Sequence, residues 1–475
     1  MQRKAIVMEF NITLNNAWWI ILPSAILFFI TLCLILLFKP ILRLMIKLVV
    51  NDMSSKLLSE KYTQNLAEFI PSMKRFSLLN AIELSLRAEH GEIIMRPLGS
   101  PKHFLGFENL MFTLKQMRKP ALHDATPIDM SVQIGTKAKK PLNIKIPLMI
   151  SAMAYGMALS EEAKIALAKA SKQLGTVTNS GQGPFLPEEA KEADKYVLQI
   201  SRWPWGARTD EQIETADMLE VLMGHGAYLG TSALEFGKMQ GRAQELGGLN
   251  PDQQAIPFPL PPGVQQTKDW KNFIKILRKR ANGKPIAIKL MATDDLEDDL
   301  SEAIDLGFDV IVLDGAQGGS HASTPITQDD FGIPTLNALI RARRFLDNCF
   351  KGKDITLIIA GGFFTPGQCL KALALGADAI YLATVPLFAL AHNQTQKVMP
   401  YEPLTTLVYY DSPAKTKFEI EVGTVSVVNA LNSMVLEMEE ALRALGKSSL
   451  KELTPDDLVA LDRDTAEVTG VRRVF

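Results

Sequence analysis

The sequence predicts an α/β protein in which a closed (βα)8 barrel of parallel strands follows a single N-terminal transmembrane helix. The barrel is indicated by eight short apolar runs that alternate with helix-type patterns from about residue 141. Small residues, many of them glycine, follow several of these runs. The membrane helix is indicated by residues 17–38, which carry no charged side chain. At about 1.5 Å per residue they reach roughly 33 Å as a helix, enough to cross a bilayer core.

The composition excludes several classes of protein. The chain has 475 residues, is 47% hydrophobic and has a formal net charge of −1, so it shows no basic bias toward nucleic acid. Its cysteines, Cys33, Cys349 and Cys369, lie far apart, without the spacing of a disulfide framework or a thiolate metal site. The six histidines form no recognisable metal-binding pair. We therefore expect no nucleic acid, no protein-bound metal and a reducing compartment.

The apolar segment fits a membrane anchor better than a cleaved signal peptide, because it is long and continues directly into KPILRLMIKLVV. Lysine and arginine are more numerous after the segment than before it, which predicts that the large C-terminal part is cytoplasmic. We expect residues 1–50 to form the anchor. It comprises a transmembrane helix at about 17–38 and, after Pro40, a short helix at the membrane surface. These features predict a single-pass protein of the inner (cytoplasmic) membrane.

We divide the rest of the chain into a lead-in segment at 51–140, a barrel at 141–400 and a helical extension at 401–475. Residues 231–266 form an unusually long connection after the fourth run. Connections of that length within a barrel are more often lids or substrate loops than plain linkers. The eight runs are IPLMIS, GTVTNS, KYVLQIS, DMLEVLM, PIAIKLM, FDVIVLDG, ITLIIAGG and AIYLAT.

A phosphate site is predicted after the last two runs. The active site of such a barrel lies at the C-terminal ends of its strands. Gly361 and Gly362 follow the seventh run, and Ala383 and Thr384 follow the eighth. Glycine lets backbone amides approach an anion without an intervening side chain. These two loops therefore indicate a cofactor that carries phosphate.

A lysine stands inside the fifth run. Lys289 lies in AIKLM, and a lysine in a barrel interior requires an anionic partner. One interpretation is an ion pair with an acid on the next strand, such as Asp314. The other places the ammonium beside N1 and O2 of a flavin, where reduction builds negative charge.

Several stretches together resemble the FMN-binding domain of glutamate synthases, and in particular the short stand-alone proteins of that family. MISAMAYGMALSEEAKIALAKASKQLG is similar to the family's first strand and helix, TVTNSGQG to its TNTGEG loop, and IAIKL contains its strand lysine. DGAQGGSHAS resembles its DGxxGGTGAS loop, and IIAGGFFTPGQCLKALALGADAIYLAT its phosphate-binding half. The similarity covers about residues 91–475. It implies an FMN held in a (βα)8 barrel.

The resemblance also implies which residues hold FMN. The loops after the seventh and eighth strands would bind its phosphate, and the first strand's loop would pack beside the isoalloxazine ring. Lys289 would face the polar edge of the flavin, and Gln199 would hydrogen-bond the ring. The implied set is Ala152, Met153, Ala154, Gln199, Lys289, Gly318, Gly319, Ser320, Gly361, Gly362, Ala383 and Thr384.

In this family, reduced FMN delivers a hydride to 2-iminoglutarate, which forms from 2-oxoglutarate and ammonia. The resemblance implies an oxidoreductase of this kind, acting on 2-oxoglutarate or a related amino or imino acid. The sequence departs from the family in two respects that affect the chemistry. The cysteine triplet after the eighth strand is replaced by VPLFALAHNQTQKVMP, so no iron–sulfur cluster is expected. The glutamine-hydrolysing domain has no counterpart, so ammonia would come free or from another chain.

Other departures fall on side chains near the substrate. Gln182 replaces the glutamate of the TNTGEG loop, and His321 replaces a glycine. We interpret His321 either as an acid–base group or as a loop residue at the barrel mouth, and favour the second interpretation for His225. A substrate anion would be bound by Arg202 or Arg208. The candidate catalytic residues are Lys289, His321 and Gln182.

The source of electrons and one alternative function stay open at this stage. No GxGxxG follows an early strand, so a separate electron donor is implied, either ferredoxin or a membrane quinone. Two other barrel families fit poorly, because the nucleophilic cysteine of IMP dehydrogenase and the His-Gly-x-Arg of hydroxy-acid oxidases are absent. The alternative is a flavin-binding or scaffold subunit at the inner membrane that has no turnover.

Overall fold

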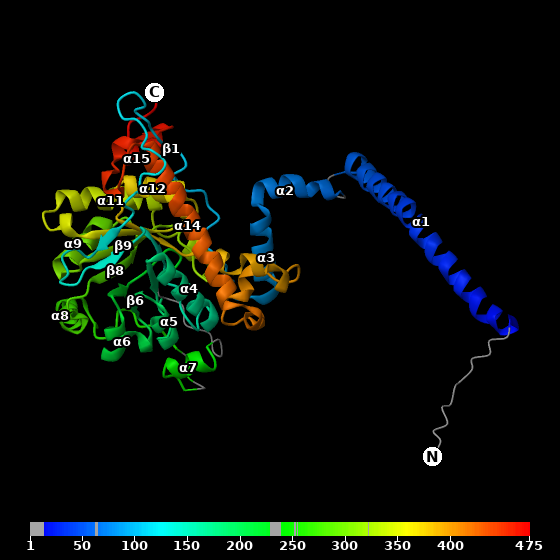
Figure 1. Ribbon diagram of the computed structural model, residues 1–475, viewed down its shortest axis with the longest axis horizontal. Coiled ribbons are helices and arrows are strands. Elements are labelled where there is room, and N and C mark those ends of the chain that lie inside the picture. The colour runs from blue at the N-terminus through cyan, green and yellow to red at the C-terminus, as the bar shows by residue number, and fades with distance from the viewer. Residues whose placement is uncertain (1–13, 62–64, 229–238, 251–252, 254, 322) are drawn as a thin grey trace, which may run out of the picture. The chain divides into compact units, whose positions relative to one another are not determined.

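The computed structural model of the chain describes all residues except 1–13, 62–64, 229–238, 251–252, 254 and 322. It contains two compact units, Met1–Ile94 and Met95–Phe475 (Figure 1). The elements of the first unit are the helices α1 (Leu14–Ser59), α2 (Phe69–Phe76) and α3 (Leu78–His90) and a 3-10 turn at Leu66–Glu68.

Helix α1 is long enough and apolar enough to cross a membrane. The candidate span, Leu22–Ser59, buries none of its apolar window within the protein. The separate surface helix that we expected after Pro40 is not a separate element, because α1 continues through Pro23 and Pro40. A proline removes one backbone hydrogen bond and kinks a helix. The leucines, lysines and methionines around Pro40 are good helix formers, which accounts for helix on both of its sides.

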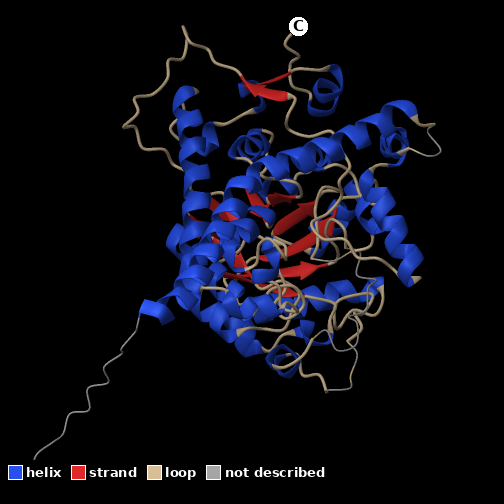
Figure 2. Cartoon of the chain, turned by 90° about the vertical axis from the view of Figure 1, so that its right-hand side faces the viewer, coloured by secondary structure: helices blue, strands red, loops and turns tan. Residues whose placement is uncertain are grey.

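Eight parallel strands form the centre of the second unit, and they coincide with the eight predicted runs. Each strand is hydrogen-bonded to its neighbours in the order β4-β11-β10-β9-β8-β7-β6-β5, and the edge strands β4 and β5 contact each other, so the barrel is nearly closed. Figure 2 shows these strands surrounded by helices. They are β4 (Leu148–Ile150), β5 (Val177–Asn179), β6 (Lys195–Ile200), β7 (Met218–Leu222), β8 (Ile286–Met291), β9 (Val310–Asp314), β10 (Thr356–Ala360) and β11 (Ala379–Leu382).

A hairpin closes the N-terminal end of the barrel. Strand β2 (Val132–Ile134) pairs antiparallel with β3 (Leu142–Ile144). The apolar side chains of this hairpin share one buried cluster with inward-facing residues of all eight strands. The Gly135 N–H also donates to Thr356 Oγ1, at the start of β10, over 2.9 Å. Because this end is filled, the opposite end, where the strands finish, is left to form a site.

The helices around the barrel bury its outer surface in a second, larger apolar cluster. Those that follow the strands are α4 (Glu161–Leu174), α5 (Pro187–Glu192), α6 (Asp210–Thr215), α8 (Trp270–Ala281), α9 (Leu296–Leu306), α11 (Thr335–Asn348), α12 (Pro366–Ala374) and α13 (Thr384–Ala391). The short helices α7 (Arg242–Leu246) and α10 (Pro325–Asp329) lie in connections. Further 3-10 turns span Pro204–Ala207, Thr267–Asp269, Gly352–Asp354, His392–Lys397, Leu404–Leu407, Pro413–Lys417, Leu450–Glu452 and Pro455–Asp457.

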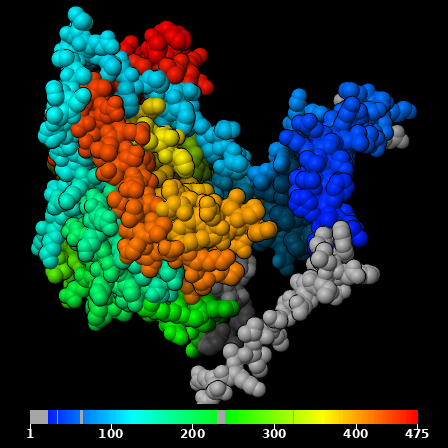
Figure 3. All heavy atoms as spheres, turned by 45° about the vertical axis from the view of Figure 1, so that its right-hand side comes forward, coloured from blue at the N-terminus to red at the C-terminus, as the bar shows by residue number. Residues whose placement is uncertain are grey.

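The segments before and after the barrel are hydrogen-bonded to each other through a short antiparallel pair of strands. Strand β1 (Leu110–Phe112) pairs antiparallel with β12 (Leu458–Ala460). Helix α14 (Ile420–Ala444) packs against α4 and α13, and Figure 3 shows it in orange on the surface of this unit. A last helix, α15 (Arg463–Thr469), packs on α11. Residues from Met95 onward therefore belong to the same unit as the barrel.

Candidate functional site

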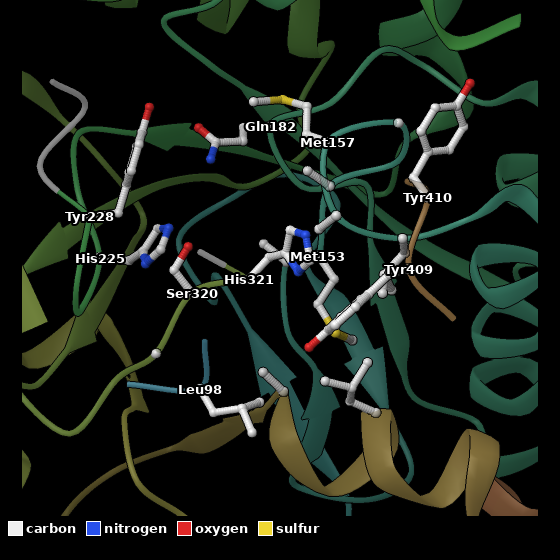
Figure 4. A pocket seen from close by; sticks show the side chains of 18 of the residues that line it. Leu98, Met153, Met157, Gln182, His225, Tyr228, Ser320, His321, Tyr409 and Tyr410 are labelled. Atoms are coloured by element: carbon white, nitrogen blue, oxygen red, sulfur yellow. The ribbon is translucent and has the colours of Figure 1, made fainter. Parts of the chain in front are cut away.

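Two adjoining cavities lie at the C-terminal ends of the strands. The larger has a volume of about 430 Å³ and the smaller about 160 Å³. Figure 4 shows His225 and Tyr228 on one side of the larger cavity and Tyr409 and Tyr410 on the other. The cavities form one site, because six residues line both of them: Leu98, Ala152, His225, Gly319, Ala383 and Thr384.

The smaller cavity is lined by the two loops that we predicted to bind phosphate. Gly361 and Gly362 have φ angles of +107° and +80°, which L side chains rarely adopt. A Cβ atom on Gly362 would lie 2.6 Å from the Cβ of Gln317, so the backbone here is packed too closely for a side chain. Helix α13 begins at Thr384 without a side-chain cap, which leaves the first N–H groups of its backbone free to bind an anion.

The N-terminus of helix α12, in contrast, is not available to bind an anion. Thr365 and Gln368 form a capping box that hydrogen-bonds the first backbone groups of the helix. The phosphate site predicted from these loops therefore falls on the glycine pair and on α13. This arrangement fits the phosphate of FMN, since it combines close backbone approach with an uncapped helix start.

Lys289 and Asp314 form a buried pair in the wall of the smaller cavity. The Lys289 Nζ lies 3.6 Å from Asp314 Oδ2, and the two side chains are 3% and 9% exposed. Burial raises the pKa of Asp314, and the ammonium of Lys289 opposes that rise. The other carboxylate oxygen, Oδ1, has no hydrogen-bond partner within the described chain. Both interpretations of Lys289 are therefore compatible with the geometry, because the lysine contacts Asp314 and also lines the cavity.

A polar network fills the barrel interior below the larger cavity. The Gln199 amide donates from Nε2 to Glu220 Oε1 over 2.7 Å, and Asn179 Nδ2 donates to the same oxygen over 3.0 Å. Gln199 is 1% exposed, yet its Oε1 has no hydrogen-bond partner in the part of the chain that the structure describes. A buried acceptor without a donor is costly. The residues present therefore fit a flavin, whose ring N–H would supply the missing donor.

His321 lies in the wall of the larger cavity, close to a tyrosine and a carboxylate. Its ring is edge-on to Tyr409, with centroids 4.1 Å apart, and its Nε2 is 3.9 Å from Asp411 Oδ1. Tyr409 and Asp411 come from the C-terminal extension, which sequence analysis did not associate with the site. They reach it because the backbone of Tyr409 forms a bridge with Leu159. The sequence signal was an aromatic pair followed by an acid, YYD at 409–411.

His225 lines both cavities, although we had favoured a plain loop position for it. Burial and the nearby Lys289 lower the pKa of His225 to about 3, so the ring is neutral at physiological pH. Its Nδ1 lies 2.7 Å from the Gly226 carbonyl and must donate to it. The Nε2 is therefore the basic nitrogen of this ring. The ring stacks on Tyr228 with a centroid distance of 5.0 Å.

Gln182 is fixed by two tryptophans. The indole of Trp203 donates to Gln182 Oε1 over 2.9 Å, and that of Trp205 donates to the Gln182 carbonyl over 2.8 Å. The two indoles are stacked, with centroids 5.5 Å apart. The side-chain amide N–H groups of Gln182 are consequently its free donors toward the cavity that it lines. Gln182 can orient a ligand through these groups, but it cannot exchange a proton as a carboxyl group does.

The structure brings together the predicted catalytic and FMN-binding residues at these two cavities, whereas neither Arg202 nor Arg208 is among the described lining residues. Their individual roles remain predictions. The segment at residues 95–98 also contributes to the wall of the site, which local sequence patterns did not indicate. Its Leu98 N–H donates to the Ser320 carbonyl over 3.0 Å, and Arg96 forms a backbone bridge with Ser323. The lining residues of the larger cavity that were not predicted are Met95, Leu98, Gly156, Met157, Ala158, Leu159, Trp203, Leu222, Tyr228, Leu387, Tyr409, Tyr410 and Asp411.

A family described as the conserved region in glutamate synthase matches residues 102–448. The chain is 31% identical to a glutamate synthase large subunit-like protein of Rhizobium meliloti (strain 1021), over 82% of this chain and 92% of that protein. It is 25% identical to an archaeal-type glutamate synthase (NADPH) of Dehalococcoides mccartyi, over 87% of this chain and 85% of that protein.

Among solved structures, the chain is similar to an active chimera of (S)-mandelate dehydrogenase, with 17% identity and a TM-score of 0.48 over 74% of this chain and 88% of that one. It is similar to flavocytochrome b2 with pyruvate bound, with 18% identity and a TM-score of 0.48 over 78% of this chain and 79% of that one.

The fold and the site define a glutamate synthase-like oxidoreductase built on a parallel barrel. The chain belongs to the glutamate synthase family.

Proposed function

We propose that this protein is a membrane-anchored, FMN-dependent oxidoreductase that interconverts an amino acid and the corresponding imino acid. The observation that carries the proposal is the glycine-lined loop pair beside Lys289 in a chain of the glutamate synthase family. The two loops would provide an anion site for the FMN phosphate, and Lys289 would provide a cation for the polar edge of the flavin.

When bound, FMN supplies the two-electron chemistry by exchanging a hydride with the carbon of the substrate C–N bond. The residues of this chain would hold it: Gly361, Gly362 and Thr384 the phosphate, Lys289 the polar edge and Gln199 the ring. The unpartnered Oε1 of Gln199 supports this assignment.

The proton that accompanies the hydride requires an acid or base at the substrate nitrogen. His321 suits this role because its Nε2 lies within reach of a carboxylate, Asp411 Oδ1, at 3.9 Å. His225 and Gln182 would then orient the substrate, His225 as a neutral acceptor and Gln182 as an amide donor.

The anchor would place this reaction at the inner (cytoplasmic) membrane, with the barrel in the cytoplasm. The long apolar helix α1 supports that location. Each turnover transfers two electrons between FMN and the amino acid, so a partner must supply or remove two electrons. Ferredoxin or a membrane quinone would do so, and the anchor favours the quinone.

The experiment uses full-length protein purified in detergent, with its flavin photoreduced under argon. Imines formed from 2-oxo acids and ammonia are then added, beginning with 2-oxoglutarate, and flavin absorbance near its visible maximum is followed. Anaerobic reoxidation that requires both the 2-oxo acid and ammonia would support the proposal. Flavin that is bound yet inert to every imine and amino acid would contradict it and favour a flavin-binding scaffold subunit.

A further inference from the structure

Arg202 is a buried cation whose hydrogen bonds are incomplete. It follows β6 at the C-terminal end of the barrel and is 7% exposed. Its Nη1 donates to the Pro259 carbonyl over 3.1 Å, and its own carbonyl accepts from the Phe258 N–H over 2.7 Å. The end of the long connection thus fixes Arg202. Its Nε and Nη2, however, are buried and have no hydrogen-bond partner among the described residues.

Such a group indicates an anionic ligand, because a buried guanidinium without a counter-charge is strongly disfavoured. Arg202 lies behind the described wall of the larger cavity, next to residues that form it. The next residue, Trp203, lines that cavity, and the charge of Arg202 acts on both Tyr228 and His225, which line it as well.

Arg208, the other candidate for binding an anion, serves the fold instead. Its Nε donates to the Gln199 carbonyl over 2.9 Å, and its Nη2 donates to the carbonyls of Gly181 and Gly183 over 3.3 and 2.9 Å. These bonds hold the loops after β5 and β6 together. Arg208 Nη1 also has no hydrogen-bond partner among the described residues, but the charge of Glu189 acts on this guanidinium. Of the two candidate arginines, Arg202 is therefore the one whose charge is left without a protein counter-charge in the described part of the chain.

The rest of the larger cavity is poor in positive charge. Its described lining residues include the carboxyl of Asp411 and no lysine or arginine. Lys289, in the smaller cavity, is already paired with Asp314. Thioether, aliphatic and aromatic side chains make up much of the remaining wall: Met95, Met153, Met157, Leu159, Leu222, Trp203, Tyr228, Tyr409 and Tyr410.

We propose that the site binds an amino or imino acid with a single carboxylate, held by Arg202, and a large apolar or aromatic side chain that packs against this wall. The inference rests on the proposed function and specifies its substrate class. A dicarboxylate such as 2-oxoglutarate would bring a second negative charge into a wall that has Asp411 and no described cation to receive it, and its desolvation would be uncompensated.

Isothermal titration of the full-length protein compares phenylpyruvate, its neutral amide and 2-oxoglutarate. We expect phenylpyruvate to bind at least about tenfold more tightly than either of the other two, because charge-assisted hydrogen bonds to a buried arginine are strong. Arg202→Met should weaken phenylpyruvate binding by about tenfold to a hundredfold. The control is Arg463→Met, in which an arginine with a 77% exposed side chain is removed and binding should not change.

Equal or tighter binding of 2-oxoglutarate, or unchanged phenylpyruvate binding in Arg202→Met, would overturn the inference. If Arg202→Met does not fold, the comparison of the acid with its amide on the unaltered protein decides. The proposed function is judged separately by flavin content and reoxidation. Flavin reoxidised by the imine of 2-oxoglutarate, together with weak phenylpyruvate binding, would leave that function standing and remove only the substrate class.

Discussion

Two buried lysine–carboxylate pairs in the described part of the barrel unit differ in how closely their charges approach. Lys164, in α4, has no exposed surface and makes three contacts of 2.8 Å, to Glu189 Oε1 and to the carbonyls of Met153 and Asn179. Lys289 lies 3.6 Å from Asp314 Oδ2, and Asp314 Oδ1 has no hydrogen-bond partner among the described residues.

The difference indicates two purposes. The Lys164 ammonium is in close contact with three oxygens of the protein, and it fixes the ends of β4 and β5 so that Met153 lies in the cavity wall. The Lys289 pair is wider and lines a cavity, as expected for a group that completes its interactions with a ligand. A buried pair is therefore more informative about function when its partners stand apart beside a cavity than when they are in close contact.

The largest effect on stability is expected where the charges of the pair are in close contact. Lys164→Met removes the ammonium from Glu189 Oε1 and from two buried carbonyls, and leaves the Glu189 carboxylate with only the Tyr196 hydroxyl as a donor among the described residues, which should cost about 3–5 kcal/mol of unfolding free energy. Urea denaturation followed by circular dichroism measures this. Lys451→Met, at a 75% exposed side chain, is the control. A loss below about 1 kcal/mol would show that the pair does not support the fold.

The Lys289→Met substitution should lower the unfolding free energy less at low pH than at high pH, because Asp314 can take up a proton at low pH. Burial raises the pKa of Asp314 and Lys289 opposes this, so the variant has a folded-state pKa above the unfolded one. The folded state then retains a proton that the unfolded state has lost. The unfolding free energy of the variant should therefore fall as pH rises through the folded-state pKa.

Thermal denaturation of the Lys289→Met variant and the unaltered protein between pH 5 and pH 8 tests this dependence. FMN affinity of the variant should also fall, by about tenfold to a hundredfold, since a charge-assisted contact is lost. A difference in melting temperature that is the same at every pH would contradict the conclusion that Asp314 takes up a proton in the folded variant.

A substitution at Gly362 tests whether the loops after β10 and β11 bind the FMN phosphate. Gly362→Ala forces an L side chain to a φ of +80° and against Gln317, which should cost about 1–2 kcal/mol and reduce bound flavin. Gly367→Ala is a matched control five residues away, because a Cβ there meets no atom within 4 Å and glycine is unfavourable in helix α12. Equal flavin content in the two variants would argue against these loops as the phosphate site.

The smallest effect on stability is expected at His321, which is partly exposed. His321→Gln should change the unfolding free energy by no more than about 0.5 kcal/mol and leave FMN bound. The rate of flavin reoxidation by an imine should nevertheless fall by about a hundredfold or more, because a positioned acid is removed. Stopped-flow absorbance measures this rate. An unchanged rate would show that His321 forms part of the cavity wall and does not act as an acid.

The sequence predicts the barrel well because parallel strands covered on both faces are continuous apolar runs, and all eight runs form strands. The predicted loop residues also lie together, since they follow those strands. Local patterns did not predict the contribution of Tyr409 and Asp411, whose approach to the site depends on packing between distant segments. They also did not predict the contribution of residues 95–98 to the wall of the site, which depends on a backbone bridge between Arg96 and Ser323.

The central claim is that the Lys289 pair and the glycine loops hold one FMN. The most direct test is the visible spectrum of the detergent-purified protein, followed by acid release and chromatographic identification of any flavin. We predict one FMN per chain, and less bound FMN in Lys289→Met and Gly362→Ala than in the control variants Lys451→Met and Gly367→Ala. Purified protein that carries no flavin and binds none on reconstitution would contradict the claim.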